Sequence, residues 1–219
     1  MEKGPDPLIR DLDSADLPAA AAVVGRGMRD NPLHVRAFGD DPARREARLT
    51  ALFTALLRRQ HLAQGVILGA SVDDRLVGVC GMIQPGRCRP TLAQTLRVLP
   101  TLVTGRGFGL TLRVVNWTSA WPRRDAGDPH WHLGPVAVER HLQGQGIGSL
   151  LLEECCRRLD AAGADAYLET DKAENLAFYE RFGFQTVGDD IVQGVTSWFM
   201  VRTIRTLVSA APARFAGPA

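Results

Sequence analysis

A glycine-rich turn at residues 143–148, Gln-Gly-Gln-Gly-Ile-Gly, has the composition of a phosphate-binding loop. Glycine carries no Cβ atom, so Gly144, Gly146 and Gly148 leave successive backbone N–H groups open to a single anion. The turn runs directly into an apolar helical segment that begins at Ser149, and the N-terminus of a helix attracts negative charge. The turn therefore predicts a pyrophosphate site.

Two better-known phosphate loops fit this turn poorly. A P-loop needs Lys followed by Ser or Thr after its last glycine, and neither pair follows Gly148. The dinucleotide fingerprint needs Gly-x-Gly-x-x-Gly directly after a strand, whereas the third glycine comes one residue early here and residues 139–142 intervene. The pattern that does match is Gln/Arg-x-x-Gly-x-Gly.

This hexad resembles the cofactor-binding turn of the GNAT superfamily of acyl-CoA-dependent N-acetyltransferases. The similarity extends to the strand-like run 131–138, to the helix after the turn, and to residues 175–184, Asn-Leu-Ala-Phe-Tyr-Glu-Arg-Phe-Gly-Phe. Together these parts span roughly residues 130–190. The resemblance implies an α/β fold with a mixed, mostly antiparallel sheet of about six to seven strands. It also implies a splay between the fourth and fifth strands, and helices on both faces.

The resemblance further implies acetyl-CoA as co-substrate, with its pantetheine arm placed between the splayed strands. Pro135 indicates an opening at the same place, because proline cannot donate to a strand ladder. One backbone N–H group of residues 136–138 could also stabilise the oxyanion that forms when an amine attacks the thioester. The residues implied to bind the cofactor are Val136, Ala137, Val138, Gln143, Gly144, Gln145, Gly146, Ile147, Gly148, Ser149, Asn175 and Tyr179.

An acceptor amine arrives mostly as ammonium and must lose a proton before it attacks, so a base is needed. His132 lies eleven residues before Gln143, at the position where some GNAT members carry a glutamate base. Imidazole accepts a proton near neutral pH, although a histidine on a strand is also often a hydrogen-bonded core residue. His130 shares the face of His132 by two-residue alternation and is the second candidate; Glu139 and Glu169 follow.

Tyr179 matches the family's tyrosine whose hydroxyl approaches the cofactor sulfur and can protonate the departing thiolate, whose pKa should be about 8.5. The alternative is a tyrosine that only packs. With His132, Tyr179 predicts acetyl transfer to an amine by direct attack in a ternary complex. A small-molecule acceptor is favoured, while a protein N-terminus or lysine, and a non-catalytic acyl-CoA sensor, remain open.

Composition limits the other possibilities. The chain has 219 residues, 45% of them hydrophobic, and a net charge of +2, which favours one domain over residues 1–204 with a tail at 205–219. The balanced charge and the lack of a long apolar run predict no nucleic-acid or membrane partner and a cytoplasmic protein. Four cysteines without metal-ligand spacing predict free thiols and no metal; they are Cys80, Cys88, Cys155 and Cys156.

Residues 85–129 form an insertion between the third and fourth strands, with two amphipathic helical patterns around 92–103 and 110–121. It could be a substrate lid, a cover for the sheet or a homodimer surface, and its seven arginines form either a solvated face or an anion site. Elsewhere the patterns predict strands at 8–12, 65–72, 76–84, 130–138, 165–170, 185–188 and 196–203. They predict helices from Ser14 to Asn31, at 42–61, at 150–159 and at 175–183.

Overall fold

A computed structural model of the chain describes residues 7–87, 108–121 and 129–204. Its strands are β1 (Leu8–Asp11), β2 (Gly65–Val72), β3 (Arg75–Ile83), β4 (Trp131–Val138), β5 (Ala166–Thr170), β6 (Gln185–Val192) and β7 (Val195–Arg202). They form one sheet in the order β1-β2-β3-β4-β5-β7-β6. Among the strands of the described residues, only β4 and β5 are parallel neighbours. The mixed, mostly antiparallel sheet confirms the α/β fold that the sequence predicts.

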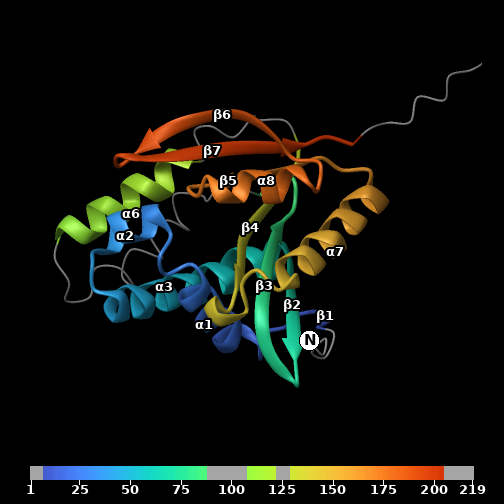
Figure 1. Ribbon diagram of the computed structural model, residues 1–219, viewed down its shortest axis with the longest axis horizontal. Coiled ribbons are helices and arrows are strands. Elements are labelled where there is room, and N and C mark those ends of the chain that lie inside the picture. The colour runs from blue at the N-terminus through green and yellow to red at the C-terminus, as the bar shows by residue number, and fades with distance from the viewer. Residues whose placement is uncertain (1–6, 88–107, 122–128, 205–219) are drawn as a thin grey trace, which may run out of the picture.

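Helices cover both faces of this sheet (Figure 1). They are α1 (Leu17–Gly27), α2 (Pro32–Phe38), α3 (Pro42–Leu56), α4 (Leu62–Gln64), α6 (Phe108–Ala120), α7 (Ile147–Ala162) and α8 (Glu174–Glu180), with a π-helical turn η1 (Leu57–His61) and a 3-10 turn η3 (Arg140–Leu142). Alternate strand residues feed two separate cores, as their periodicity requires. Ile67 and Val79 join the core under α1, α2, α3 and α6, whereas Leu68 and Cys80 join the core under α7 and α8.

The sheet opens between β4 and β5. The two strands pair only at Trp131 with Ala166 and at His132 with Tyr167, and they separate beyond that point. The pairing of β3 with β4 shifts register between Cys80 and Met82, next to Gly134 and Pro135. In Figure 1, β5, β6 and β7 cross the direction of β2 and β3. The splay that the family resemblance implies is confirmed.

The two hairpins turn on residues with positive φ. Asp73 and Asp74, with φ of 48° and 58°, connect β2 to β3 as the sequence predicts. Gln193 and Gly194, with φ of 53° and 80°, connect β6 to β7. Left-handed residue pairs match the twist of paired strands, so both turns set the register of their hairpins.

One predicted helix boundary is wrong. The sequence predicts that Asn31-Pro32 ends a helix, but α1 ends at Gly27 and Pro32 opens α2. Proline suits the first helical position because its missing N–H has no partner there and its φ is already helical. Asp41 does begin the next helix, α3, and its side chain accepts from two backbone N–H groups at 3.1 Å.

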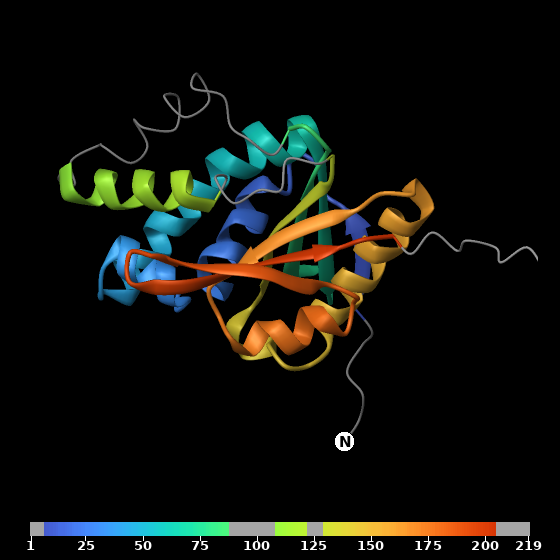
Figure 2. The same ribbon diagram turned by 90° about the horizontal axis from the view of Figure 1, so that it is seen from above.

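Helix α6 is the described part of the insertion, and it packs beside α2 (Figures 1 and 2). Its Val114 and Trp117 are buried, and the Trp117 ring lies 5.0 Å from His34 and 6.3 Å from Phe38. Arg113 donates from Nε to the carbonyl oxygen of Ala37 at 3.1 Å. This helix therefore covers α2. The other predicted insertion helix, 92–103, and the tail 205–219 lie outside the described residues.

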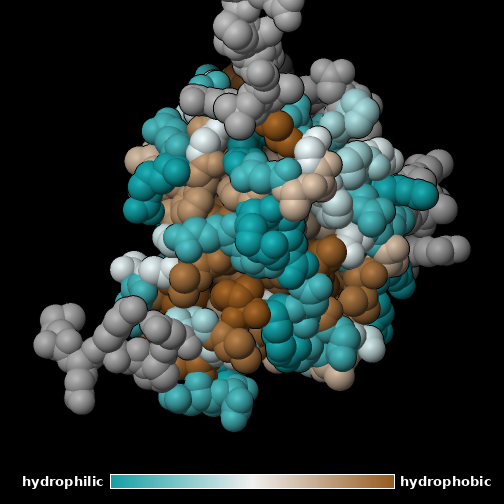
Figure 3. All heavy atoms as spheres, turned by 90° about the vertical axis from the view of Figure 1, so that its right-hand side faces the viewer, coloured by the Kyte–Doolittle hydropathy of each residue, from teal (hydrophilic) through white to brown (hydrophobic). Residues whose placement is uncertain are grey.

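Three further features concern the hydropathy of the surface, the length of the helices and the state of the cysteines. Figure 3 shows hydrophobic residues interrupted by hydrophilic ones on the side of the molecule that faces right in Figure 1. Among residues 7–87, 108–121 and 129–204 there is no helix that is both long and apolar enough to cross a membrane. Cys80, Cys155 and Cys156 are free and buried, and Cys88 lies outside the described ranges.

Candidate active site

A cleft of about 340 Å³ lies where β4 leaves β5. Three parts of the chain meet there: the end of α1, the glycine turn with the first residues of α7, and helix α8. Its volume is within the range of ligand sites, and its polar groups converge at the helix N-terminus. It is lined by Gly27, Met28, Asn31, Val136, Ala137, Val138, Leu142, Gln143, Gly144, Gly146, Gly148, Ser149, Lys172, Asn175, Phe178, Tyr179 and Arg181.

The glycine turn forms an open cradle at the N-terminus of α7. Gly144 and Gly146 have φ of 77° and 88°, a conformation that glycine adopts without strain. A Cβ atom added at either position would meet no atom within 4 Å, so the space above the backbone is free for a ligand. The first turn of α7 carries no acidic residue. This arrangement fits a pyrophosphate group.

Gln143 holds the cradle in place. Its Nε2 donates to the carbonyl oxygens of Gly27 and Val138, both at 3.0 Å, and so joins the turn to α1 and to β4. A Cβ atom on Gly27 would lie 2.5 Å from the Val138 oxygen, so glycine is required for α1 to approach this closely. The side chain of Gln143 is thus used within the protein, and its backbone borders the cleft.

The structure brings most of the predicted cofactor residues into this one cleft. Two do not line it: Gln145 is exposed and donates from Nε2 to the His141 oxygen at 3.1 Å, and Ile147 is buried in the core under α7. Asn175 lines the cleft and donates from Nδ2 to Oγ1 of Thr170 at 3.1 Å. Its side chain therefore also ties α8 to the end of β5.

Several lining residues were not predicted. Gly27 and Met28 reach the cleft through the packing of α1, and Asn31 reaches it through its contact with Asp171; no local pattern marks them. Lys172 and Arg181 lie just before and just after α8. Their positive charges could have been recognised in the sequence as suited to the predicted pyrophosphate site. Phe178 supports Arg181, whose guanidinium carbon lies 5.4 Å from the ring centre. The same ring would lie 3.5 Å from a Cβ atom on Gly148, which is an ordinary van der Waals contact, so Phe178 packs against the start of α7.

Tyr179 lies on α8 at the edge of the cleft. The centre of its ring lies 5.2 Å from that of Phe178 and 6.0 Å from that of Phe184, and the residue is buried. Burial raises the pKa of the hydroxyl well above its ordinary value of 10.0, and the nearby Cys80 and Asp171 add to the shift. Tyr179 therefore keeps its proton throughout the neutral and mildly alkaline range.

His132 contacts Glu169 across the opening of the sheet. Its Nε2 lies 2.9 Å from Oε2 of Glu169, and the side chains are 22% and 3% exposed respectively. His132 does not line the 340 Å³ cleft. It projects from the face of β4 opposite to Leu133, which belongs to the core under α7. This opposite face is the one that α1, α3 and α6 cover.

The other candidate bases differ in their surroundings. His130 is buried, and its ring lies 5.2 Å from Tyr167, whose ring also lies 5.7 Å from His132. Both histidines therefore share one face, as the alternation predicts. Glu139 is buried in a pair with Arg26, whose Nε lies 3.0 and 3.1 Å from its two carboxylate oxygens. This pairing favours a structural role for Glu139.

Two further groups shape the same region. His61, at the end of the π-helical turn, contacts the carbonyl oxygen of Gly134 from Nε2 at 2.5 Å. Asp171 follows β5 directly, is buried, and accepts from the backbone N–H of Leu33 at 2.7 Å and from Nδ2 of Asn31 at 3.4 Å. The contact of His61 with Gly134 supports the bulge of β4. The contacts of Asp171 fix the start of α2 beside the cleft.

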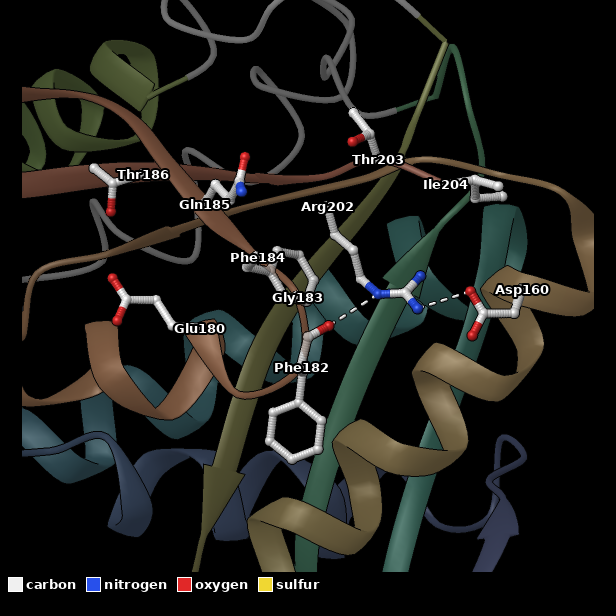
Figure 4. A pocket seen from close by; sticks show the side chains of 10 residues that line it. All are labelled: Asp160, Glu180, Phe182, Gly183, Phe184, Gln185, Thr186, Arg202, Thr203 and Ile204. Atoms are coloured by element: carbon white, nitrogen blue, oxygen red, sulfur yellow. Dashed lines mark hydrogen bonds and ion pairs between the residues drawn. The ribbon is translucent and has the colours of Figure 1, made fainter. Parts of the chain in front are cut away.

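A larger hollow of about 870 Å³ lies away from this chemistry, between the ends of α7, α8 and β7 (Figure 4). Its one arginine, Arg202, donates to the Phe182 oxygen at 2.9 Å and to Asp160 at 2.7 Å. Its charge is therefore already balanced. The residues that line this hollow include no part of the glycine turn. Within the described ranges, no group of three or more His, Cys, Asp or Glu side chains could hold a metal ion.

The sequence matches a known protein family. The family model described as Acetyltransferase (GNAT) family matches residues 33–184, which is more than half of the chain. Mycothiol acetyltransferase from Saccharomonospora viridis is 34% identical over 82 residues, which are 35% of this chain and 27% of that protein. The match thus spans about a quarter of the length of this curated relative.

Solved structures with the same fold cover nearly the whole chain. One is described as histone acetyltransferase HPA2 and related acetyltransferase from Corynebacterium glutamicum. It has a TM-score of 0.69 and 22% identity over 91% of this chain and 97% of that one. Another is a GNAT family acetyltransferase from Brucella melitensis in complex with acetyl-CoA, with a TM-score of 0.50 and 18% identity over 90% of this chain and 88% of that one. At these identities the two structures show the shared fold.

Proposed function

This chain belongs to the GNAT acetyltransferase family, and on that premise we propose that it transfers the acetyl group of acetyl-CoA to a primary amine of a small molecule. The observation that carries this proposal is the cleft with its glycine cradle, set at the N-terminus of α7 and beside the opening between β4 and β5. The solved relative from Brucella melitensis, described as a complex with acetyl-CoA, supports the choice of co-substrate. Residues 1–204 would then be one catalytic domain with an insertion at 85–129.

The residues of the cleft divide the work of binding acetyl-CoA. The backbone of Gly144 and Gly146 and the start of α7 would hold the pyrophosphate, with Lys172 and Arg181 adding positive charge at the rim. Residues 136–138 pair with β3 on one side only, and on the side where β5 has separated they offer backbone groups to the pantetheine arm in the manner of an added strand. Acetyl-CoA supplies the thioester carbonyl that the amine attacks.

His132 is the proposed base. The amine nitrogen attacks the carbonyl carbon, the C–N bond forms, the C–S bond breaks, and the surplus amine proton passes to the imidazole directly or through a water. The contact with Glu169 supports this proposal, because it lies beside the last pair of β4 and β5 before the sheet opens. A backbone N–H of the splayed β4 would stabilise the oxyanion. The acetyl group passes straight to the amine, so the reaction needs a ternary complex and no acetylated protein.

Tyr179 is the proposed partner of the departing sulfur. A thiolate with a pKa of about 8.5 is too weak a base to remove the proton of a tyrosine whose pKa lies well above 10.0. The hydroxyl therefore donates a hydrogen bond to the developing thiolate, which is released as the thiolate and equilibrates with the protons of the bulk solvent. This refines the prediction of a general acid, because the donor stabilises charge without giving up its proton.

The hydrogen bonds of the turn between β6 and β7 favour a small acceptor. Gln193 accepts from Nε of Arg36 on α2 at 3.1 Å, and its side-chain amide donates to the Arg113 oxygen on α6. The turn is thereby tied to both helices on the face to which His132 points. A polypeptide acceptor would need a groove that stays open along its path. A polypeptide N-terminus or lysine is the second candidate acceptor, and a homodimer remains a prediction.

The function is tested by incubating the full chain with acetyl-CoA and a panel of amines that includes antibiotics, polyamines and short peptides. Thiol release measures turnover, and mass spectrometry identifies the acetylated product. We expect acetylation of a small primary amine with one thiol released per product. Acetylation of peptides alone would transfer the proposal to a protein acceptor. Cofactor binding without any acetylated product would support an acyl-CoA sensor.

A further inference from the structure

Glu169 lies behind His132 on the neighbouring strand. The parallel pairing of His132 with Tyr167 places Glu169, two residues further along β5, on the same face as the imidazole. β4 turns away beyond that pair, so the imidazole and the carboxylate bridge the first gap of the opening, with Nε2 and Oε2 2.9 Å apart. This contact links the two strands at the point where their backbone hydrogen bonds stop.

The two partners differ sharply in exposure. The Glu169 side chain is 3% exposed, whereas the His132 side chain is 22% exposed. Glu169 is also held by its backbone, which pairs with Phe199 of β7 in a regular antiparallel ladder. The carboxylate is thus a rigid, buried support, and the imidazole is the member of the pair that solvent or a substrate can reach.

The contact also decides which ring nitrogen can act as the base. An ionised carboxylate only accepts hydrogen bonds, so the Nε2 atom that faces Glu169 must carry the hydrogen. In a neutral imidazole the other nitrogen, Nδ1, then holds the lone pair that can take a proton. When Nδ1 is protonated, the resulting positive charge lies beside the carboxylate of Glu169.

We propose that Glu169 is a positioning residue that fixes the Nε2–H tautomer of His132 and thereby makes Nδ1 the proton acceptor. The inference rests on the proposed function of His132 as the base. It differs from the prediction that Glu169 itself could be the base, because Glu169 acts here through His132. The amine proton moves to Nδ1, and the imidazolium later returns that proton to solvent, so Glu169 neither gains nor loses a proton.

The tautomer can be measured without turnover. In ligand-free protein with ¹⁵N-labelled histidine, long-range proton–nitrogen spectra at a pH where His132 is neutral distinguish Nε2–H from Nδ1–H. We expect the Nε2–H form in the wild type and a mixture in Glu169→Leu. Glu169→Gln keeps an acceptor oxygen at the same reach and should retain more of the Nε2–H form. An Nδ1–H form in the wild type, or an unchanged spectrum in Glu169→Leu, would overturn the proposal.

A matched control is another buried carboxylate. Glu139 pairs with Arg26 and not with a histidine, so Glu139→Leu should leave the His132 tautomer unchanged. If Glu139→Leu altered the tautomer as much as Glu169→Leu, the effect would be a general loss of structure and the proposal would fall. Circular dichroism of each variant reports whether it is folded.

Kinetics then show whether Glu169 acts through His132. With an accepted amine, Glu169→Leu should lower kcat by no more than the loss of the base itself, which is typically about 10²- to 10⁴-fold, and should change the KM for acetyl-CoA little. Adding Glu169→Leu to His132→Gln should lower kcat no further. Fully additive losses would mean that Glu169 has an independent role. A chain that shows the expected tautomers but acetylates no amine would refute the proposed function and leave the positioning role intact.

Discussion

His61 Nε2 lies 2.5 Å from the carbonyl oxygen of Gly134, a contact that joins the π-helical turn to β4 at the point where the sheet opens. A Cβ atom on Gly81 would lie 2.5 Å from the His61 ring, so the neighbouring strand makes room for this contact. Burial lowers the pKa of His61 to about 4. The imidazole is therefore neutral at physiological pH and donates to Gly134 through Nε2–H.

This contact predicts a pH dependence of stability. An unfolded histidine has a pKa of about 6.5, so between pH 6.5 and pH 4 the unfolded chain binds a proton that folded His61 does not. Acidification in this window favours unfolding. His61 alone should lower the free energy of unfolding by about 1.6 kcal/mol between pH 6.5 and pH 5, because the slope reaches about 1.36 kcal/mol per pH unit only once the unfolded histidine is fully protonated. Buried His34, whose pKa burial also lowers, adds to the loss.

Urea unfolding at pH 5 and pH 7 measures this loss in wild type and in His61→Gln, which cannot titrate. The difference in unfolding free energy between the two pH values should be smaller in the variant. His141→Gln replaces an exposed histidine and should behave as the wild type. Equal pH dependence in His61→Gln and wild type would show that His61 is not held neutral by the fold.

Gly146→Val should abolish the binding of acetyl-CoA and keep the fold. The residue precedes α7 with φ of 88°, and its Cα faces open space, so a branched side chain would strain the turn and fill the cradle. Isothermal calorimetry compares the affinities. Gly163→Val is the matched control, because Gly163 also has positive φ and open space but lies at the far end of α7. Undiminished affinity in folded Gly146→Val would remove the turn from the cofactor site.

Tyr179→Phe should lower kcat by about 10²-fold, the scale for loss of one hydrogen-bond donor to developing charge, with little change in cofactor affinity. Phenylalanine keeps the ring contacts with Phe178 and Phe184, so the fold should persist. Because burial raises the pKa of Tyr179, its titration should cause no fall in wild-type rate below about pH 10. An unchanged kcat in the variant would make Tyr179 a packing residue.

The parts of the site that are contiguous in the chain could be predicted from the sequence. The glycine turn and the segment around Tyr179 each carry their own spacing, and the structure places both at one cleft. Pro135 marked the opening of the sheet because a proline interrupts any ladder. The fold and the family are confirmed, whereas the roles of His132 and Tyr179 stay predictions.

The missed features depend on contacts between distant residues. The pairing of His132 with Glu169 requires the parallel register of β4 and β5, which no local pattern fixes. Asn31 reaches the cleft because Asp171, at the end of β5, holds it and the start of α2. Pro32 was read as a stop signal because a proline that ends one helix and a proline that opens the next look alike in sequence.

His132 is proposed to remove the proton from the amine at the opening between β4 and β5. The most direct test of this role is the pH dependence of kcat/KM for one accepted amine in wild type and in His132→Gln. The wild-type rate should fall on the acid side, because a protonated imidazole cannot accept a proton, and the variant should lose that limb. The defect should shrink as the pH approaches the pKa of the amine, since free amine then forms without help. An acid limb that persists unaltered in His132→Gln, or a defect that is constant across pH, would contradict the assignment.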